Sequence, residues 1–572
     1  MTISKNLMFK LKNKEYFSSF TPALKVGQES RIIWIDCLFL GSILLLLQAF
    51  IIWGLGFYSD DWHFLAVFHN ASDKSISSLI YNFFVQDLNV RMRPVQIVNM
   101  VFLYKLFGTN PLGYHVVNSL FILSAVILLY VSLILMKLPR FIAIGIAVIY
   151  AFLPHFSTDR IWMATFHTNL SISFFFLNFI AIVQSLKTKG KNSWYWLLVS
   201  LLSVMLSILA YEVVIPLFLV VYAVFLWKGN KRFSFSFKAL NKKTNLVILF
   251  NIVVFSLCVL FKAWISVRTG GFYTSYKQHL WYVFTSVIKN DFITYGFKLP
   301  VVIWKIFRNY YNGLLLAVGL PLGILIFLYI QRLFLILFKP QDWLKIILAG
   351  IVVYWAGYAI FSTTAAFMVH PTGISNRIAM AASIGVATCF LGAIGFTSSL
   401  LPSFRVKKYF FSAAIACLGT FGFMINYTIA TFFHRAYPIE LEIIADLQKN
   451  VPVLSGNSVL ILDGICPYVG PALVFETSWD VTGMLRIAYN LKQVSGNIRT
   501  YTFKYNQKGI TTIIYGQETF YPFNENLLLY NYLTKQKVVL ANFAAADAYF
   551  KNTEFTPDSC PPGTEGSGVA IF

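Results

Sequence analysis

The sequence predicts an all-α polytopic membrane protein that ends in a C-terminal extracytoplasmic α/β domain. Of the 572 residues 58% are hydrophobic and only 12% are charged, whereas soluble domains carry about 25% charged residues. Apolar runs of about 20 residues, long enough to cross a bilayer, alternate with short polar connections. After residue 436 the pattern changes, and the tail holds 12 of the 23 acidic residues but only 9 of the 46 basic ones.

Three parts are expected along the chain. Residues 1–31 form a basic cytoplasmic tail, 32–436 a transmembrane domain, and 437–572 an extracytoplasmic soluble domain. The transmembrane part has two long outer loops, at 58–112 and 266–311. Eleven spans are predicted: Ile32–Phe57, Gly113–Met136, Phe141–Leu153, Asn169–Leu186, Trp194–Ala210, Val213–Trp227, Asn245–Ile265, Gly313–Ile330, Leu344–Met368, Arg377–Phe396 and Tyr409–Phe432.

The distribution of charge predicts the orientation. The net charge of +23 comes mainly from short basic clusters between spans, on one side throughout, which is the positive-inside pattern. We therefore expect a multi-pass protein of the cell inner or plasma membrane with a cytoplasmic N-terminus. Clusters of this kind contact anionic membrane lipids, and they do not form the continuous basic face of a nucleic-acid-binding protein.

Shorter elements are expected outside the spans. The first outer loop contains candidate interfacial helices at Trp62–His69, Ser75–Leu88 and Pro94–Phe107, the last opening with proline as helix starts allow. In the tail, β-branched and aromatic residues predict strands at Val459–Asp463, Thr500–Tyr505, Thr511–Tyr515 and Val538–Ala541. Helices are predicted at Pro438–Lys449 and Trp479–Lys492. Cys466 and Cys560 could form a disulfide if the tail lies outside the cytoplasm.

Two adjacent carboxylates, Asp60 and Asp61, directly follow the first apolar run. Ionisable groups near membrane depth are costly, so their presence favours a functional site. A partly desolvated carboxylate beside a like charge has a raised pKa and can accept a proton from a hydroxyl. We expect one of the pair to be a catalytic base. The alternative is a helix N-cap, formed by Ser59 or Asp60.

Four arginines on the same predicted side are candidates for binding a donor phosphate. Arginine forks bind phosphate oxygens bidentately, which suits Arg91 and Arg93, although lipid headgroup contact explains them equally well. Arg377 at the outer end of a span could hold a phosphate or pyrophosphate; its alternative is interfacial snorkelling. Arg160 is the fourth candidate, but it could simply pair with its neighbour Asp159.

Other polar residues, Asp159 among them, are expected at the same site. Glu212 is an isolated acid between two spans, so it either orients a cation or contacts a ligand. Histidines could join Asp60 or Asp61 in holding a metal, but their spacings match no metal motif, and interfacial hydrogen bonding is favoured. No cofactor is predicted, and a divalent metal is left open. The histidines in question are His63, His115, His155, His167 and His370.

Several motifs resemble the GT-C glycosyltransferase superfamily. They are Asp60-Asp61 after the first span, Arg93-Pro94-Val95, and the stretch from Phe107 to Asn118, which reads FGTNPLGYHVVN. The pattern is most similar to the transmembrane O-mannosyltransferases with TPR repeats and their bacterial relatives. Turns at Pro154-His155, at Ala210–Pro216 and at Asn376–Gly385 resemble later motifs of that branch, which has glutamate where this chain has Asn376. A globular domain stands in place of the TPR repeats.

The resemblance implies a polyprenyl-phosphate sugar as donor, an active site at the outer leaflet and inversion at the anomeric carbon. Carried over residue by residue, it implies Asp60 or Asp61 as the base, Arg377 as a donor-phosphate ligand and Glu212 as a further site residue. Bacterial relatives of this shape modify envelope polymers, so the expected acceptor is a cell-envelope glycan or a lipid-linked one.

Two other kinds of protein are alternatives to a glycosyltransferase. A flippase for polyprenyl-linked glycans often has repeated, broken helices and charges through the membrane midplane. Here the middles of the predicted spans are nearly free of charge, and no repeat is visible. A purely structural envelope protein would leave the outer carboxylates and arginines unexplained.

Overall fold

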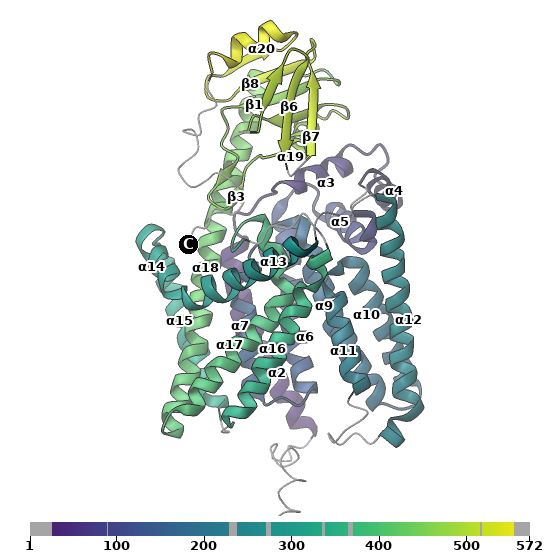
Figure 1. The fold of residues 1–572 in the computed structure, drawn as a ribbon, viewed down its shortest axis with the longest axis vertical. Coiled ribbons are helices and arrows are strands. Elements are labelled where there is room, and N and C mark those ends of the chain that lie inside the picture. Colours follow the sequence, from purple (N-terminus) through teal and green to yellow (C-terminus); the bar gives the residue numbers. More distant parts are fainter. Residues whose placement is uncertain are drawn as a thin grey trace, which may run out of the picture.

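The protein is a helical bundle that carries an α/β domain at one end (Figure 1). The computed structural model describes residues 26–87, 90–227, 237–269, 276–334, 338–363, 370–500, 502–514 and 517–553. Within these ranges nine helical segments are long and apolar enough to cross a membrane. The helices that make up all or most of these segments are α2 (Val26–Ile52), α6 (Pro111–Leu135), α9 (Phe166–Lys187), α10 (Lys191–Ala210), α12 (Phe237–Thr269), α15 (Gly313–Leu333), α16 (Pro340–Ala359), α17 (Met380–Leu400) and α18 (Phe404–Asn450).

The protein is therefore a multi-pass membrane protein. The other two predicted spans correspond to α7 (Arg140–Phe152) and α11 (Ile215–Trp227), each of 13 residues. Helices of that length rise about 20 Å, less than the hydrocarbon core of a bilayer. All twelve residues from Phe141 to Phe152 of α7 are buried, so this helix is packed inside the bundle rather than facing lipid.

Glycine allows the two most closely packed spans, α16 and α17, to touch along their backbones. A Cβ built on Gly385 of α17 would lie 2.3 Å from the backbone nitrogen of Tyr354, and one on Gly357 of α16 would lie 2.4 Å from the Cα of Ala382. Small residues permit such close approach in membrane helices, where dispersion rather than hydrophobic burial drives association. The contact fixes the start of α17, directly after the turn that carries Arg377.

Short elements gather where the bundle meets the α/β domain, which we call the domain-side end (Figure 1). The first loop holds α3 (Asp60–His69), α4 (Ile76–Gln86), η1 (Val90–Met92) and α5 (Pro94–Phe107), close to the three predicted helices. The other elements are η2 (Pro154–Phe156), α8 (Thr158–Ile161), η3 (Met163–Thr165), η4 (Glu212–Val214), α13 (Tyr276–Ile288), the π-helical η5 (Lys289–Phe297), α14 (Leu299–Asn309), η6 (Ile360–Thr363) and η7 (Ile374–Ala379).

Helix α18 joins the bundle to the domain without a break. The sequence predicted a span at Tyr409–Phe432 and a separate helix at Pro438–Lys449, but one helix of 47 residues covers both and contains Pro438. Proline removes one backbone hydrogen bond from a helix. Burial of apolar side chains on both sides of Pro438 outweighs that loss, because Phe423 in the bundle and Leu447 in the domain are both fully buried. The expected boundary after residue 436 falls inside this helix.

The domain is built on a four-stranded sheet in the order β4-β1-β8-β9. β4 (Ser495–Ile498), β1 (Val459–Asp463) and β8 (Leu527–Asn531) are parallel, and β9 (Gln536–Val539) is antiparallel to β8. A three-stranded antiparallel sheet contains β5 (Lys504–Asn506), β6 (Gly509–Ile514) and β7 (Gln517–Pro522), and a small ribbon contains β2 (Tyr468–Val469) and β3 (Ala472–Leu473). The helices are α19 (Ser478–Ala488) and α20 (Phe543–Phe550).

The two faces of the main sheet belong to different cores. Ile461 and Leu529 pack with Phe550 of α20 in a small core of the domain. Leu460 and Leu462, which alternate with Ile461 on β1, belong to the core that continues through the bundle. Successive residues of a strand point to opposite faces, so the face of the sheet that carries Leu460 and Leu462 belongs to the apolar core that continues into the bundle.

The strand predictions for the tail were partly correct. Val459–Asp463 coincides with β1, while the other three predicted strands overlap β5, β6 and β9 with shifted ends. β2, β3, β4, β7 and β8 were not predicted. The predicted helix Trp479–Lys492 ends earlier, at Ala488. Cys466 is disulfide-bonded, and its expected partner Cys560 lies outside the described residues.

Candidate active site

Asp61 is buried and holds two chain segments together. Its Oδ2 accepts a hydrogen bond from the backbone N–H of Tyr58 at 3.0 Å, and its Oδ1 accepts one from Ala164 at 2.8 Å. The side chain is completely buried. Burial raises its pKa well above the usual range, and the charge of Asp60 raises it further. With both oxygens engaged by backbone donors, Asp61 fixes the start of α3 against η3.

Asp60, in contrast, is partly exposed and available to a ligand. Burial raises its pKa, while the positive charges of Arg377 and His63 lower it and the charge of Asp87 raises it. Ser59 occupies the N-cap position of α3, but its side chain makes no capping hydrogen bond. Asp60 is thus the carboxylate of the pair that a substrate hydroxyl can reach.

Arg377 lies in η7 with its guanidinium 5.1 Å from the ring centre of Trp162. No ion pair or hydrogen bond joins its guanidinium to any residue in the described ranges. Its charge lowers the pKa of two carboxyls, Asp60 and the buried Asp159, although burial still keeps the pKa of Asp159 well above normal. An arginine that is partly exposed and close to these acids can bind an anionic group from outside the chain.

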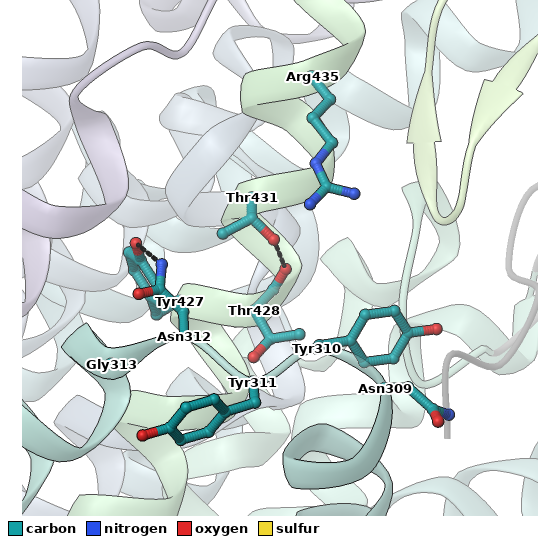
Figure 2. Close-up of a pocket in the computed structure, with 9 residues that line it drawn as sticks. All are labelled: Asn309, Tyr310, Tyr311, Asn312, Gly313, Tyr427, Thr428, Thr431 and Arg435. Atoms are coloured by element: carbon teal, nitrogen blue, oxygen red, sulfur yellow. Dashed lines mark hydrogen bonds between the residues drawn. The ribbon is translucent and has the colours of Figure 1, made fainter.

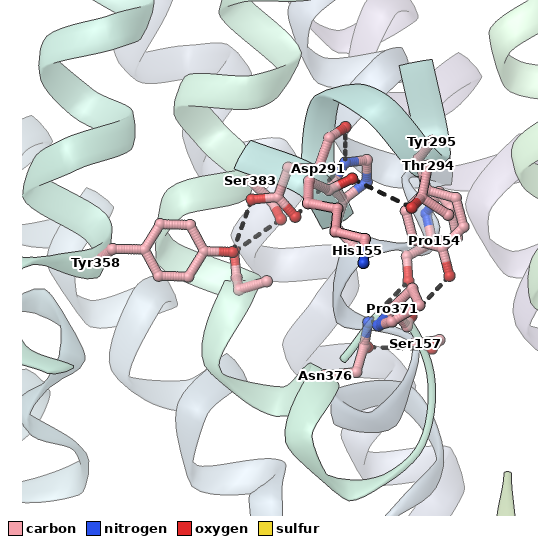
Figure 3. Close-up of polar contacts among 12 residues, drawn as sticks. Pro154, His155, Ser157, Asp291, Thr294, Tyr295, Tyr358, Pro371, Asn376 and Ser383 are labelled. Atoms are coloured by element: carbon pink, nitrogen blue, oxygen red, sulfur yellow. Dashed lines mark hydrogen bonds and ion pairs between the residues drawn. The ribbon is translucent and has the colours of Figure 1, made fainter. Parts of the chain in front are cut away.

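Asn376 fixes the turn that carries Arg377 (Figure 3). Its Oδ1 accepts hydrogen bonds from the Ser157 hydroxyl at 3.1 Å and from the backbone N–H of Thr158 at 3.2 Å. Its Nδ2 donates to the carbonyl of Pro371 at 2.7 Å, which also accepts from the Tyr295 hydroxyl at 2.6 Å. The glutamate of the resembled family would place a charge in this buried position, whereas asparagine supplies both a donor and an acceptor.

A buried acid stands behind this turn (Figure 3). Asp291 of η5 accepts a hydrogen bond from the Tyr358 hydroxyl at 2.8 Å, and its backbone carbonyl lies 3.0 Å from Nε2 of His155. Burial raises the pKa of Asp291 to about 7 and lowers that of His155 to about 4. His155 therefore stabilises the turn and does not face the exposed groups of the site.

Glu212 joins two cations in a second cluster. Arg93 donates two hydrogen bonds to its carboxylate, and Nζ of Lys262 lies 3.0 Å from Oε2. The Arg93 guanidinium also lies 4.5 Å from the ring centre of Tyr211. The cluster carries a net positive charge. Lys262 was not among the residues predicted from the sequence, although a lone lysine near the end of an apolar run is a functional signal.

The α/β domain reaches the same site through α19, which packs on α3. A Cβ built on Gly483 would lie only 2.4 Å from the backbone carbon of Trp62, so no larger residue fits there without a shift. Trp62 Nε1 donates to Oε2 of Glu440 on α18 at 3.0 Å. Trp479 of α19 lowers the pKa of Asp60. No sequence signal linked Trp479 to the first loop.

The other candidate residues have separate partners. Arg91 donates to the carbonyls of Phe84 and Val85, both at 2.6 Å, and so closes the end of α4. Arg160 is fully buried and donates to the carbonyl of Ala151 at 2.7 Å. Neither arginine faces Asp60.

The remaining histidines also lie apart from one another. Nε2 of His115 lies 2.9 Å from the carbonyl of Gly56, and His63 lies 3.9 Å from Asp87. His167 packs against the ring of Tyr211, and His370 is partly exposed beside Pro371. Across the described ranges no group of three His, Cys, Asp or Glu side chains is placed to hold a metal ion.

No protein-family model and no curated protein matches the chain. Two crystal structures of ArnT from Cupriavidus metallidurans are similar to it, one bound to undecaprenyl phosphate and one in the apo state. The first shares 13% identity, with 81% of this chain and 89% of that chain covered and a TM-score of 0.34. The apo structure shares 12% identity, with 81% of this chain and 85% of that chain covered and a TM-score of 0.36.

Proposed function

We propose that the protein is an inverting GT-C glycosyltransferase that moves a sugar from a polyprenyl-phosphate donor to a cell-envelope glycan or lipid-linked acceptor. One observation carries the proposal. The Asp60 carboxylate and the Arg377 guanidinium are both partly exposed at the domain-side end of a membrane bundle, and the charge of Arg377 lowers the pKa of Asp60. A base beside an unpaired cation is the combination that transfer from a sugar phosphate requires.

The proposed reaction assigns one task to each group. Asp60 takes the proton of an acceptor hydroxyl, whose oxygen forms a bond to the anomeric carbon. The bond from that carbon to the phosphate oxygen breaks on the opposite face, and the electron pair leaves with the polyprenyl phosphate. Arg377 neutralises the charge that develops on the phosphate. The Arg93–Glu212–Lys262 cluster, with its net positive charge, supports the same leaving group.

The proposed orientation places the domain-side end outside the cytoplasm of an inner or plasma membrane. Basic residues at the opposite ends of the spans support it, since positive residues favour the cytoplasmic side. They include Lys137 after α6, Lys187 at the end of α9 and Arg405 at the start of α18.

The test is release of polyprenyl phosphate by purified protein in liposomes, given polyprenyl-phosphate sugars and candidate glycan acceptors. We expect release by the wild type and a loss of at least about 100-fold in Asp60→Asn, with donor binding kept. Arg377→Gln should lose donor binding as well. Arg91→Gln, which removes an arginine that only closes α4, is the matched control.

Two results would overturn this function. Release at the wild-type rate in Asp60→Asn would remove this carboxylate from the chemistry. Transfer of intact donor across the bilayer without any release would identify a flippase instead.

A further inference from the structure

A polar cavity of about 520 Å³ lies between α18 and the connection from α14 to α15 (Figure 2). Its walls are the connection Asn309–Gly313 and the stretch of α18 from Tyr427 to Arg435. The volume lies within the range of small-molecule sites. Gly313 begins a membrane span, so the cavity opens at the level where the apolar part of the bundle ends.

The cavity presents one free cation and several hydrogen-bonding groups. The Arg435 guanidinium points along Thr431 toward Tyr310 (Figure 2), and Arg435 is exposed. No ion pair or hydrogen bond connects its side chain to another residue of the described ranges. Thr428 and Thr431 already donate their hydroxyl protons to backbone carbonyls, and Asn309 adds an amide group to the lining.

The helix next to the cavity has the features of a membrane-surface helix. α14 buries Val302, Ile303 and Ile306 and exposes other large apolar side chains, Val301 at 52% and Trp304 at 65%. Basic residues lie along it, whereas the only acid between residues 289 and 313 is Asp291, which is buried against Tyr358. The basic residues are Lys298, Lys305 and Arg308. Basic amphipathic helices of this kind lie in the interface and attract anionic headgroups.

We propose that this cavity binds the phosphate headgroup of an anionic membrane lipid, with Arg435 as the phosphate ligand. The lipid chain lies along α15, whose surface below the cavity exposes Leu320, Ile324 and Leu328. Arginine suits this role because its planar fork bonds two phosphate oxygens at once. The site is separate from Asp60 and Arg377, so it stands whether or not the protein is a glycosyltransferase.

The test uses a photoactivatable phosphatidic acid in nanodiscs that contain the full chain. After irradiation, labelled peptides are mapped by mass spectrometry. We expect labelling of the peptides that contain Tyr310–Tyr311 and Tyr427–Arg435, reduced about tenfold in Arg435→Gln, since a charge-assisted hydrogen bond is lost. Arg405→Gln removes an exposed arginine from the same helix at its other end and should keep full labelling. Arg377→Gln should also keep it.

Two further experiments distinguish the headgroup of a lipid from a free phosphate as the ligand. A photoactivatable diacylglycerol without phosphate should not label these peptides, and millimolar glycerol phosphate should not compete if the lipid chain contributes to binding. Equal labelling in Arg435→Gln and wild type, or equal labelling by the diacylglycerol, would overturn the proposal. Competition by glycerol phosphate would overturn the lipid part of it. Thermal unfolding of each variant confirms that the fold is intact.

Discussion

Nε1 of Trp62 donates a hydrogen bond to Oε2 of Glu440 at a distance of 3.0 Å, and this bond ties α3 to α18 across 378 positions of the chain. Glu440 is fully buried. The pair holds the helix that begins with Asp60 against the helix that continues into the α/β domain. Packing of the domain and geometry of the site are therefore coupled.

Removing the indole donor should destabilise the protein. In Trp62→Phe the Glu440 carboxyl keeps its burial but loses this partner, which costs about 1–3 kcal/mol. The thermal unfolding midpoint in detergent should fall, and activity should fall with it because α3 is loosened. Tyr81→Phe, on the exposed face of α4, changes an aromatic residue without touching this bond. Equal midpoints for Trp62→Phe and wild type would show that the bond contributes nothing.

The proposed base leads to a prediction about pH. Only the ionised Asp60 carboxylate can accept a proton, so kcat/KM should rise as pH rises through its pKa, which burial raises. The negative charge of Asp87 raises that pKa further. Asp87→Asn should therefore move the acidic limb of the profile to lower pH. The profile of kcat/KM against pH measures it, with Asp73→Asn on the exposed loop as control. A shift in the opposite direction would exclude Asp60 as the base.

Asn376 is expected to position Arg377. In Asn376→Asp a carboxylate oxygen replaces the amide that donates to Pro371, and it would face that carbonyl at 2.7 Å. Repulsion should displace the turn and raise KM for the donor more than it lowers kcat, because Arg377 is proposed to bind the donor phosphate. Asn376→Gln keeps both hydrogen-bonding groups and serves as the comparison. If both variants keep the wild-type KM, Asn376 has no role in positioning.

Glu212 and Lys262 should be coupled energetically. Glu212→Gln leaves Arg93 and Lys262 without a counterion, so it should destabilise more than a variant that also removes the Lys262 charge. In a double-mutant cycle with Lys262→Met we expect a coupling of about 0.5–3 kcal/mol. Unfolding of the four proteins in detergent provides the measurement. Strict additivity would mean that the ion pair at 3.0 Å does not stabilise the fold.

Asp291 should make stability depend on pH. Its pKa is about 7 in the folded protein against 3.8 for a free side chain, so between these values the unfolded chain holds fewer protons and stability falls as pH rises. The slope can reach about 1.4 kcal/mol per pH unit. Asp291→Asn should flatten the dependence between pH 4 and 7, as measured by thermal unfolding. An unchanged slope in this variant would assign the effect to another group.

The sequence by itself determined the membrane class and most helices of the protein. Apolar runs must match the thickness of a bilayer, and this requirement is visible in any window of about 20 residues. Helix α5 even begins at Pro94 and ends at Phe107 as predicted, because proline at a helix start and glycine after its end are local signals. The sequence selected Asp60, Asp61 and Arg377 as candidate site residues because they are rare charges beside apolar runs.

Only the tertiary structure decided which of these residues meet. Asp61 accepts a hydrogen bond from the backbone N–H of Ala164, 103 positions away, whereas its neighbour Asp60 stays partly exposed. Lys262 joins Glu212 across 50 positions, and α19 of the distant domain packs on α3. Such partners depend on how helices pack, and the packing distances are not encoded in the local periodicity of any one segment.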